Sequence, residues 1–326
     1  MSEDFLRPVS ISNWSSAYMP DRNLTWMFEV VREWDHKQQA DLGIVGLPFD
    51  GGVVTGRQGT RLGPKGVRDT LYANTAFNVE LEADLSKLKI VDCGDVRVDM
   101  MDATETYRRV ELSLAQVFKS GICPLIIGGD HSLTSYCIKG LTNTLGDKKR
   151  VGLIDFDAHF DCRASMKGPQ SGYWVREALE IPGSPIRGEN IAQIGVHGFR
   201  YSPYYLNYVK KSGIRTYTPL DVRRKGMETV VREAIDAATD GTDAVYVSVD
   251  IDVLDTAFAP GCASSYVGGL STLDLLSGVV EVGKNRSVRA LDIMEIAPPL
   301  DVGTLTSKAG AEILLEFACG FSLRQN

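Results

Sequence analysis

The sequence predicts an α/β protein built around a parallel sheet, and two observations support this prediction. Short runs of strand-forming apolar residues alternate along the chain with longer segments of helical periodicity. Most of the short runs are apolar throughout, as expected for parallel strands that helices cover on both faces. Strand–helix alternation implies right-handed βαβ crossovers, which generate a parallel sheet.

Eight apolar runs are predicted as strands, in chain order residues 42–46, 88–94, 124–129, 151–157, 191–196, 214–218, 244–250 and 288–295. Helical periodicity is found in residues 103–120, 227–238, 271–283 and 306–320. In the first of these helices, Val110, Leu114 and Val117 recur on one face, and Gly121 follows as a stop signal. The glycine-rich stretch 46–66 is predicted as a loop that wraps the carboxyl edge of the sheet. Periodicity does not distinguish a closed barrel from an open, doubly wound sheet.

Composition limits the class of protein and its partners. The 326 residues are 44% hydrophobic and 24% charged, and no repeat or linker divides them, so we expect one domain over residues 1–326. Acidic residues outnumber basic ones by 42 to 35, which predicts no nucleic-acid partner. Apolar runs stay well short of the ~20 residues that span a membrane, and no signal peptide is evident, so no membrane partner is expected. Six scattered cysteines without a CxxC pair fit buried thiols in a reducing cytoplasm.

Three acid-rich motifs follow predicted strands. They are Gly-Gly-Asp-His-Ser at 128–132, Asp-Phe-Asp-Ala-His-Phe-Asp at 155–161 and Ser-Val-Asp-Ile-Asp-Val-Leu-Asp at 248–255. Alternate side chains of an extended segment share a face, so Asp157, His159 and Asp161 can point the same way. Carboxylates gathered in this way would repel and lose solvation unless a cation lay among them. One such motif could be a solvated strand-end loop, but three in the same register predict a metal centre.

The candidate ligands are two imidazoles and four carboxylates, namely His131, Asp157, His159, Asp161, Asp250 and Asp252. Two neighbouring ions can use all of them, with Asp157 and Asp250 as bridges. The lack of a thiolate disfavours structural zinc, and oxygen-rich ligation with imidazole suits Mn²⁺, with Ni²⁺, Co²⁺ or Fe²⁺ as alternatives. Four carboxylates and two divalent ions sum to zero charge, and a bridging hydroxide then favours a cationic substrate such as an amidinium or guanidinium.

In this order, the motifs resemble those of the ureohydrolase superfamily, which includes arginases, agmatinases, other guanidino-acid hydrolases and formimidoylglutamases. The similarity extends through most of the chain, from residues 56–64 to 305–320. The resemblance implies an open three-layer α/β/α sandwich with an eight-stranded parallel sheet, and a homo-oligomer, either a trimer or a hexamer. It also implies two Mn²⁺ ions per chain, one held by His131 and Asp161, the other by His159 and Asp252, with Asp157 and Asp250 bridging.

The resemblance also assigns residues to the substrate. Glu295, at the end of the last strand, matches the family's acidic residue that meets the amidine or guanidine group. Where arginases and agmatinases carry a proton-transfer histidine, this chain has Ser171, as formimidoylglutamases have Ser or Asn. Arg163, in Asp-Cys-Arg after the metal motif, resembles the same branch and is the best candidate to meet a substrate carboxylate. Tyr173 and Trp174 depart from that branch and are expected to reshape the pocket wall.

Two further strand-end residues are weaker candidates. His197 could line the pocket as an acid or base, although a structural histidine is the more common case. Arg200 follows the same strand and is a second candidate for a carboxylate.

We therefore expect a cytoplasmic hydrolase of a linear amidine C–N bond. The expected reaction, within histidine metabolism, converts N-formimidoyl-L-glutamate and water into L-glutamate and formamide. Asp161 or a nearby group would pass a proton to the leaving amine. The alternatives are an agmatinase-like or other guanidino-substrate hydrolase that releases urea, a metal-dependent deacetylase on a related fold, and a catalytically silent scaffold subunit of a hetero-oligomer.

Overall fold

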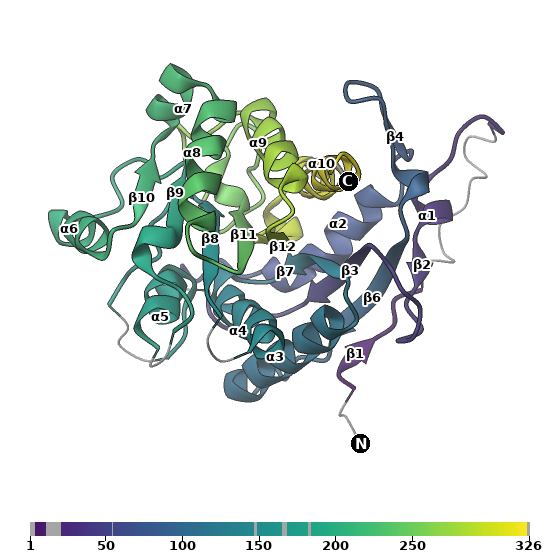
Figure 1. The fold of residues 1–326 in the computed structure, drawn as a ribbon, viewed down its shortest axis with the longest axis horizontal. Helices are drawn as coiled ribbons and strands as arrows, with labels where there is room; N and C mark the ends of the chain where they lie inside the picture. Colours follow the sequence, from purple (N-terminus) through teal and green to yellow (C-terminus); the bar gives the residue numbers. More distant parts are fainter. Residues whose placement is uncertain are drawn as a thin grey trace.

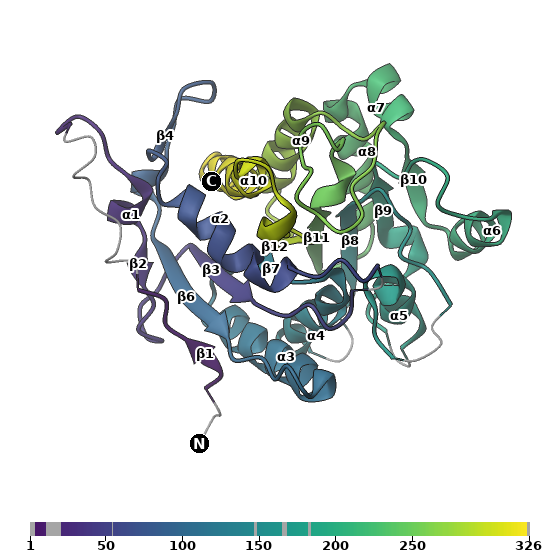
Figure 2. The same ribbon diagram turned by 180° about the vertical axis from the view of Figure 1, so that it is seen from behind.

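The computed structural model describes residues 4–10, 21–53, 55–146, 149–164, 168–181 and 184–324. Its central feature is a ten-stranded open sheet between two layers of helices (Figures 1 and 2). Eight strands run parallel in the order β6 (Ile90–Val96), β3 (Leu42–Leu47), β7 (Cys123–Gly128), β12 (Val288–Met294), β11 (Ala244–Asp250), β8 (Val151–Phe156), β9 (Ile191–Ile194) and β10 (Arg215–Tyr217). The predicted sandwich class is confirmed, and these are the eight predicted strands.

Two short strands at one edge of the sheet were not predicted. β1 (Leu6–Arg7) pairs antiparallel with β6, and β2 (Arg32–Glu33) pairs parallel with the same strand. Each has two residues, too few to show a hydrophobic period. A separate hairpin joins β4 (Phe77–Asn78) to β5 (Ala83–Asp84).

Helices cover both faces of the sheet (Figures 1 and 2). The sheet separates the hydrophobic core into two clusters, one on each face. One face is covered by α3 (Ala103–Lys119), α4 (Thr134–Leu145) and α5 (Trp174–Glu180), and the other by α2 (Gly63–Leu71), α8 (Met227–Thr239), α9 (Thr272–Lys284) and α10 (Leu305–Ser322). The remaining described helices are α1 (Met27–Val30), α6 (Pro203–Ser212) and α7 (Pro219–Lys225). In the part of the chain that the structure describes, no helix has both the length and the apolar character to cross a membrane.

The predicted loop 46–66 is only partly a loop. A 3₁₀ turn at Thr60–Leu62 leads directly into α2, which begins at Gly63. Pro64 lies at the start of this helix, where a missing N–H costs nothing because the first N–H groups have no partner within the helix. The glycines around it obscured the helical pattern in the sequence.

The order of the strands determines where the acidic motifs meet. β7, β12, β11 and β8 are neighbours in the sheet and run parallel, so their carboxyl ends lie at one edge. The residues that directly follow these strands are therefore brought together there, although they are far apart in the sequence.

A buried ion pair attaches α2 to the edge strand β6. The guanidinium of Arg68 contacts both carboxylate oxygens of Asp92, with Nε–Oδ2 at 2.8 Å and Nη2–Oδ1 at 3.0 Å. Its Nη1 lies 2.6 Å from Oδ1 of Asp95. The side chains of Arg68 and Asp92 are almost fully buried, so water cannot replace either partner.

We expect Asp92→Ala to lower the free energy of unfolding by about 3–5 kcal/mol, because it leaves the guanidinium of Arg68 buried without its main counter-ion. Urea unfolding measures this change. The matched control is Lys65→Ala in the same helix, which removes an exposed ion pair to Asp69 and is expected to cost less than about 1 kcal/mol. Equal losses in the two variants would contradict the role of burial.

Candidate metal centre

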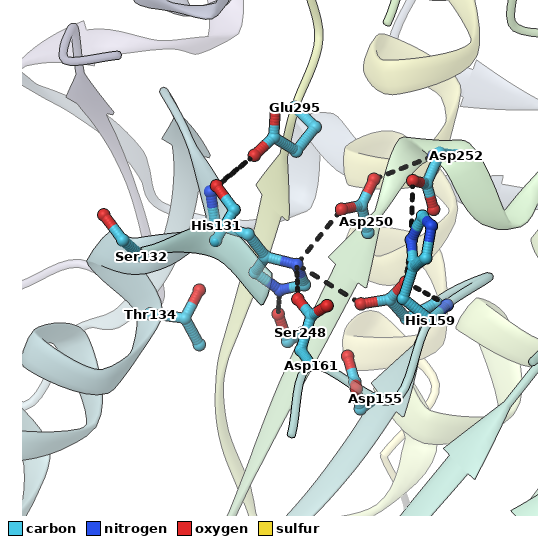
Figure 3. Close-up of polar contacts among 12 residues, drawn as sticks. His131, Ser132, Thr134, Asp155, His159, Asp161, Ser248, Asp250, Asp252 and Glu295 are labelled. Atoms are coloured by element: carbon cyan, nitrogen blue, oxygen red, sulfur yellow. Dashed lines mark hydrogen bonds and ion pairs between the residues drawn. The ribbon is translucent and has the colours of Figure 1, made fainter. Parts of the chain in front are cut away.

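The structure brings the six predicted ligands together at the carboxyl edge of the sheet (Figure 3). His131 directly follows β7, and Asp250 is the last residue of β11. The motif after β8 supplies Asp157, His159 and Asp161. All of these residues except His159, which is partly exposed, are buried. Side chains that would be expected at a protein surface are thus enclosed in one cluster.

Three carboxylates face the imidazole of His131. Its Nδ1 atom lies 3.1 Å from Oδ2 of Asp250, 3.4 Å from Oδ2 of Asp157 and 3.5 Å from Oδ2 of Asp161. The convergence of three carboxylate oxygens on one ring nitrogen is the arrangement of a cation site.

A second group forms around His159, and Asp157 connects the two. Nδ1 of His159 lies 3.1 Å from Oδ2 of Asp252 and 3.3 Å from Oδ1 of Asp157. The two oxygens of Asp157 therefore face different imidazoles, the position expected of a bridging ligand. Asp250 contacts His131, and its other oxygen accepts a hydrogen bond from the backbone N–H of Asp252 at 2.9 Å.

The charges of the cluster are poorly balanced by the protein alone. Burial, followed by the charge of Asp157, raises the pKa of Asp161 well above its ordinary value. Burial and the neighbouring Asp252 and Asp157 raise the pKa of Asp250 in the same way. Although burial opposes the shift, the neighbouring imidazoles of His131 and His159 lower the pKa of Asp157 to about 2. Oδ2 of Asp157 is buried without a hydrogen bond, so the donor set and this unsatisfied oxygen both fit bound cations.

Asp155 is the first residue of the second motif, and it was not predicted as a ligand. One oxygen each from Asp155 and Asp157 and a ring nitrogen of His131 lie within 4.8 Å of one another. The side chain of Asp155 is fully buried, with Oδ2 accepting a hydrogen bond from Gln193 at 3.0 Å and Oδ1 unpaired. Asp155 lies in β8 and precedes Asp157 by two residues, so an extended backbone places both side chains on the same face. This spacing could have identified Asp155 as a further candidate ligand.

A hydrogen-bond chain behind the cluster orients His131. Nε2 of His131 lies 2.8 Å from Oγ of Ser248, which donates to Oδ1 of Asp292 at 2.6 Å. Because the serine hydroxyl donates its hydrogen bond to Asp292, its oxygen accepts a hydrogen bond from Nε2–H of His131. The lone pair of Nδ1 is then directed at the carboxylates, as a metal-ligating imidazole requires. The sheet register explains the contact between Ser248 and Asp292, because these residues are partners in the neighbouring strands β11 and β12.

Glu295 closes the cluster on the side of β12. Its Oε1 accepts hydrogen bonds from the backbone N–H of His131 at 2.9 Å and from the hydroxyl of Ser171 at 2.6 Å. Burial and the nearby Asp130 raise the pKa of Glu295 to about 7. The backbone at Glu295 and at Asp161 is left-handed, with φ of 66° and 45°, and such strain in non-glycine residues concentrates at functional sites.

Comparison with known proteins agrees with this geometry. The model of the arginase family matches residues 40–320. The chain belongs to the arginase family. It is 35% identical to a formimidoylglutamase of Halalkalibacterium halodurans, over 94% of this chain and 95% of that protein. It is 33% identical to a guanidinopropionase of Pseudomonas aeruginosa, over 85% of this chain and 86% of that protein.

Solved structures show the same relationship. The formimidoylglutamase of Bacillus subtilis superposes with a TM-score of 0.87 at 29% identity, covering 94% of both chains. A formiminoglutamase variant of Trypanosoma cruzi with Mn²⁺ superposes with a TM-score of 0.81 at 25% identity, covering 90% of this chain and 96% of that one. The expected resemblance to ureohydrolases, and within them to formimidoylglutamases, is confirmed.

A polar pocket of this arginase-family protein opens onto the cluster. Arg163, Ser171 and Glu295, all predicted to meet substrate, line it together with Asp161, His159, Asp250 and Asp252. The lining also includes residues that the sequence did not single out, namely Val53, Thr55, Gly172, Tyr201, Ala263, Ser264 and Tyr266. Apart from Gly172, which follows Ser171, these come from loops without a predicted site residue, so only the fold places them at the site.

Four predicted residues, Tyr173, Trp174, His197 and Arg200, are not among the residues that line this pocket. Trp174 is fully buried in the core, with its ring centroid 4.7 Å from that of His131, so it supports the imidazole from behind. Tyr173 lies beside it but is not among the pocket residues. His197 borders a neighbouring hollow with Phe160 and Tyr201, and its Nδ1 lies 2.7 Å from the carbonyl oxygen of Gly195. A backbone contact thus explains the position of His197.

We expect Asp157→Ala to abolish turnover and to weaken metal binding by more than about 100-fold, because this carboxylate faces both imidazoles. Metal analysis after reconstitution with Mn²⁺, together with circular dichroism to confirm the fold, measures the effect. The control is Asp236→Ala, which removes an exposed aspartate of α8. Wild-type turnover in Asp157→Ala would refute the central position of this residue.

We expect Ser248→Ala to lower metal affinity by about 10–100-fold while the ligands themselves stay intact, because Nε2 of His131 loses its acceptor. Titration calorimetry with Mn²⁺ measures the change. Ser113→Ala is the matched control, since Ser113 is also buried but its hydroxyl makes no hydrogen bond in the described structure. Unchanged affinity in Ser248→Ala would show that the hydrogen-bond chain does not orient the ring.

Proposed function

We propose that this protein hydrolyses a linear amidine and that its substrate is N-formimidoyl-L-glutamate, with L-glutamate and formamide as products. The observation that carries the proposal is the carboxylate of Asp157 between two imidazoles, beside a pocket that also contains Glu295 and Arg163. The family membership and the similarity to formimidoylglutamases support the choice of substrate.

The cluster would hold two divalent ions. We assign His131, Asp161 and Asp250 to one ion and His159 and Asp252 to the other, with Asp157 shared, and Asp250 as the expected second bridge. Mn²⁺ fits the oxygen-rich donor set and is present in structures of the Trypanosoma cruzi relative. Such a pair of ions supplies an activated water at neutral pH and polarises the electrophile.

Glu295 would orient the amidine. A carboxylate can accept paired hydrogen bonds from a planar N–H-bearing cation and so fix its direction above the cluster. The hydroxyl of Ser171 and the N–H of His131 hold the carboxylate of Glu295 in place through Oε1, which leaves its other oxygen for the substrate.

Asp161 is the candidate for proton transfer to the leaving amine. It lines the pocket, so its carboxylate is placed beside the bound amidine, where it would pass a proton to the leaving amine. The hydroxyl of Tyr201 accepts hydrogen bonds from the backbone N–H groups of Phe160 at 3.0 Å and Asp161 at 3.3 Å, which fixes the strained segment. His197 has no place on the pocket wall from which to share this role.

Arg163 would bind a carboxylate of the substrate. Its side chain is exposed at the pocket and packs along Gly172, where a Cβ atom would lie 3.1 Å from its Cδ. It makes no ion pair with any described carboxylate. An unpaired guanidinium beside an acidic cluster is suited to hold the anionic end of an amino acid away from the cluster.

A guanidino-acid hydrolase is the second candidate. The 33% identity to guanidinopropionase favours it, and Arg163 would serve the single carboxylate of such a substrate equally well. A one-metal deacetylase fits less well, because each imidazole faces its own group of carboxylates. A silent scaffold subunit would not need the buried and strained ligand cluster that the chain retains.

The deciding experiment supplies the Mn²⁺- or Ni²⁺-loaded protein with N-formimidoyl-L-glutamate, agmatine, 3-guanidinopropionate and 4-guanidinobutyrate, and identifies the products. We expect formamide from formimidoylglutamate, with a kcat/KM at least about 100-fold above that for each guanidino compound, since none of those offers two carboxylates. Asp157→Ala serves as the background control. Urea from a guanidino compound, with no formamide, would replace our proposal with the second candidate.

A further inference from the structure

Arg200 lies against the wall of the same pocket. Its guanidinium carbon is 3.0 Å from the ring centroid of Tyr266, and Tyr266 is one of the residues that line the pocket. The ring of Tyr266 in turn meets the imidazole of His159 edge to face, with centroids 5.6 Å apart. Arg200, Tyr266 and His159 therefore form a continuous series from the outer surface to the metal cluster.

The loop that carries Tyr266 is held at several points, so the ring is a fixed platform. The backbone N–H of Thr256 donates to the carbonyl oxygen of Tyr266 at 2.7 Å. Asp255 accepts a hydrogen bond from Gly268 N–H at 2.6 Å, and its own N–H donates to Leu270. A guanidinium stacked on such a ring loses less freedom on binding an anion than one at the end of an unsupported side chain.

Among the described residues, neither Arg163 in the pocket nor Arg200 beside it has a carboxylate as an ion-pair partner. The chain has a net charge of −7, and some of its surface arginines pair with acidic side chains, as Arg108 does with Glu105 and Arg176 with Glu180, while others, such as Arg22, make no ion pair with a described carboxylate. Arg163 and Arg200 make no ion pair with a described carboxylate, although both are exposed in an acidic protein. Arg163 lines the pocket and Arg200 stacks on Tyr266, which also lines it, so two guanidinium groups at this opening are available for two anionic groups of one ligand.

We propose that Arg200, held on the ring of Tyr266, is a second carboxylate-binding residue, so that the pocket selects amidines that carry two carboxylates. The inference rests on the proposed amidine hydrolysis and specifies its substrate class. Arg163 and Arg200 each receive one carboxylate, and the amidinium meets Glu295. Each charged group of N-formimidoyl-L-glutamate then has a partner of opposite charge.

The same arrangement disfavours the other substrates of the superfamily. A guanidino acid with one carboxylate leaves one guanidinium unpaired. Agmatine brings a second cation towards two arginines, which adds repulsion. Selection therefore resides in the pocket rim, while the metal cluster is shared with relatives that act on guanidino compounds.

The test measures binding as well as turnover. Calorimetry on the Mn²⁺-loaded protein compares L-glutamate with its two neutral amides, L-glutamine and L-isoglutamine. We expect Arg200→Gln to weaken L-glutamate binding about 10-fold or more, the loss of one charge-assisted hydrogen-bonded pair. For the amide that lacks the carboxylate facing Arg200, the variant and the wild type should bind equally. Arg163→Gln should show the opposite dependence on the two amides.

The control is Arg22→Gln, which removes an exposed arginine that does not line the pocket and should bind every ligand as the wild type does. Equal losses for L-glutamate and both amides in Arg200→Gln, or no loss for any of them, would overturn the proposal. The two failures are distinguishable. A wild type that makes no formamide refutes the proposed reaction, while the binding data decide separately whether Arg200 holds a carboxylate.

Discussion

The mutual repulsion of buried carboxylates is the constraint on which this structure depends. Asp157, Asp161, Asp250 and Asp252 lie in one enclosed cluster with two imidazoles, where water cannot solvate their charge. Burial drives the pKa of Asp161 and of Asp250 upward, while the imidazoles drive that of Asp157 downward. Divalent cations would relieve the repulsion between these carboxylates, because they supply positive charge that the protein itself does not provide. A site that is unfavourable when empty is a site with high affinity for its ions.

The surrounding structure supplies the rigidity that such a cluster needs. Two hydrophobic cores clamp the central strands from both faces, so the strand ends cannot separate to relieve the repulsion. The hydrogen bonds from His131 through Ser248 to Asp292 fix the ring tautomer from within the sheet. The backbone at Asp161 and Glu295 is left-handed, and both side chains line the pocket. The conformational strain of these two residues is offset by the stability of the surrounding fold. Precision at the cluster is therefore a property of the sheet rather than of the motifs alone.

Substrate choice is controlled by different parts of the molecule. The candidate metal ligands follow central strands, whereas the loops around Thr55, Ser171 and Tyr266 contribute to the pocket wall. A formimidoylglutamase and a guanidinopropionase are relatives of similar overall identity, so one fold is compatible with more than one substrate. In our proposal, Arg163 on that wall and Arg200 stacked on Tyr266 separate a dicarboxylate from a monocarboxylate ligand.

The sequence by itself determined the eight parallel strands, four of the helices and the six metal-ligand candidates, because each depends on a local pattern. Apolar runs report burial of a strand, and alternate acidic residues report a shared face. The short edge strands were not predicted, because two residues are too few to show a hydrophobic period. The helix α2 was not predicted, because its glycines obscure the helical pattern. Only the tertiary structure decided that β12 and β11 separate β7 from β8, which brings Glu295 and the three motifs to one point. It also placed Trp174 behind His131, His197 in a separate hollow and Tyr266 under Arg200, because contacts between distant loops follow from packing, which no local pattern records.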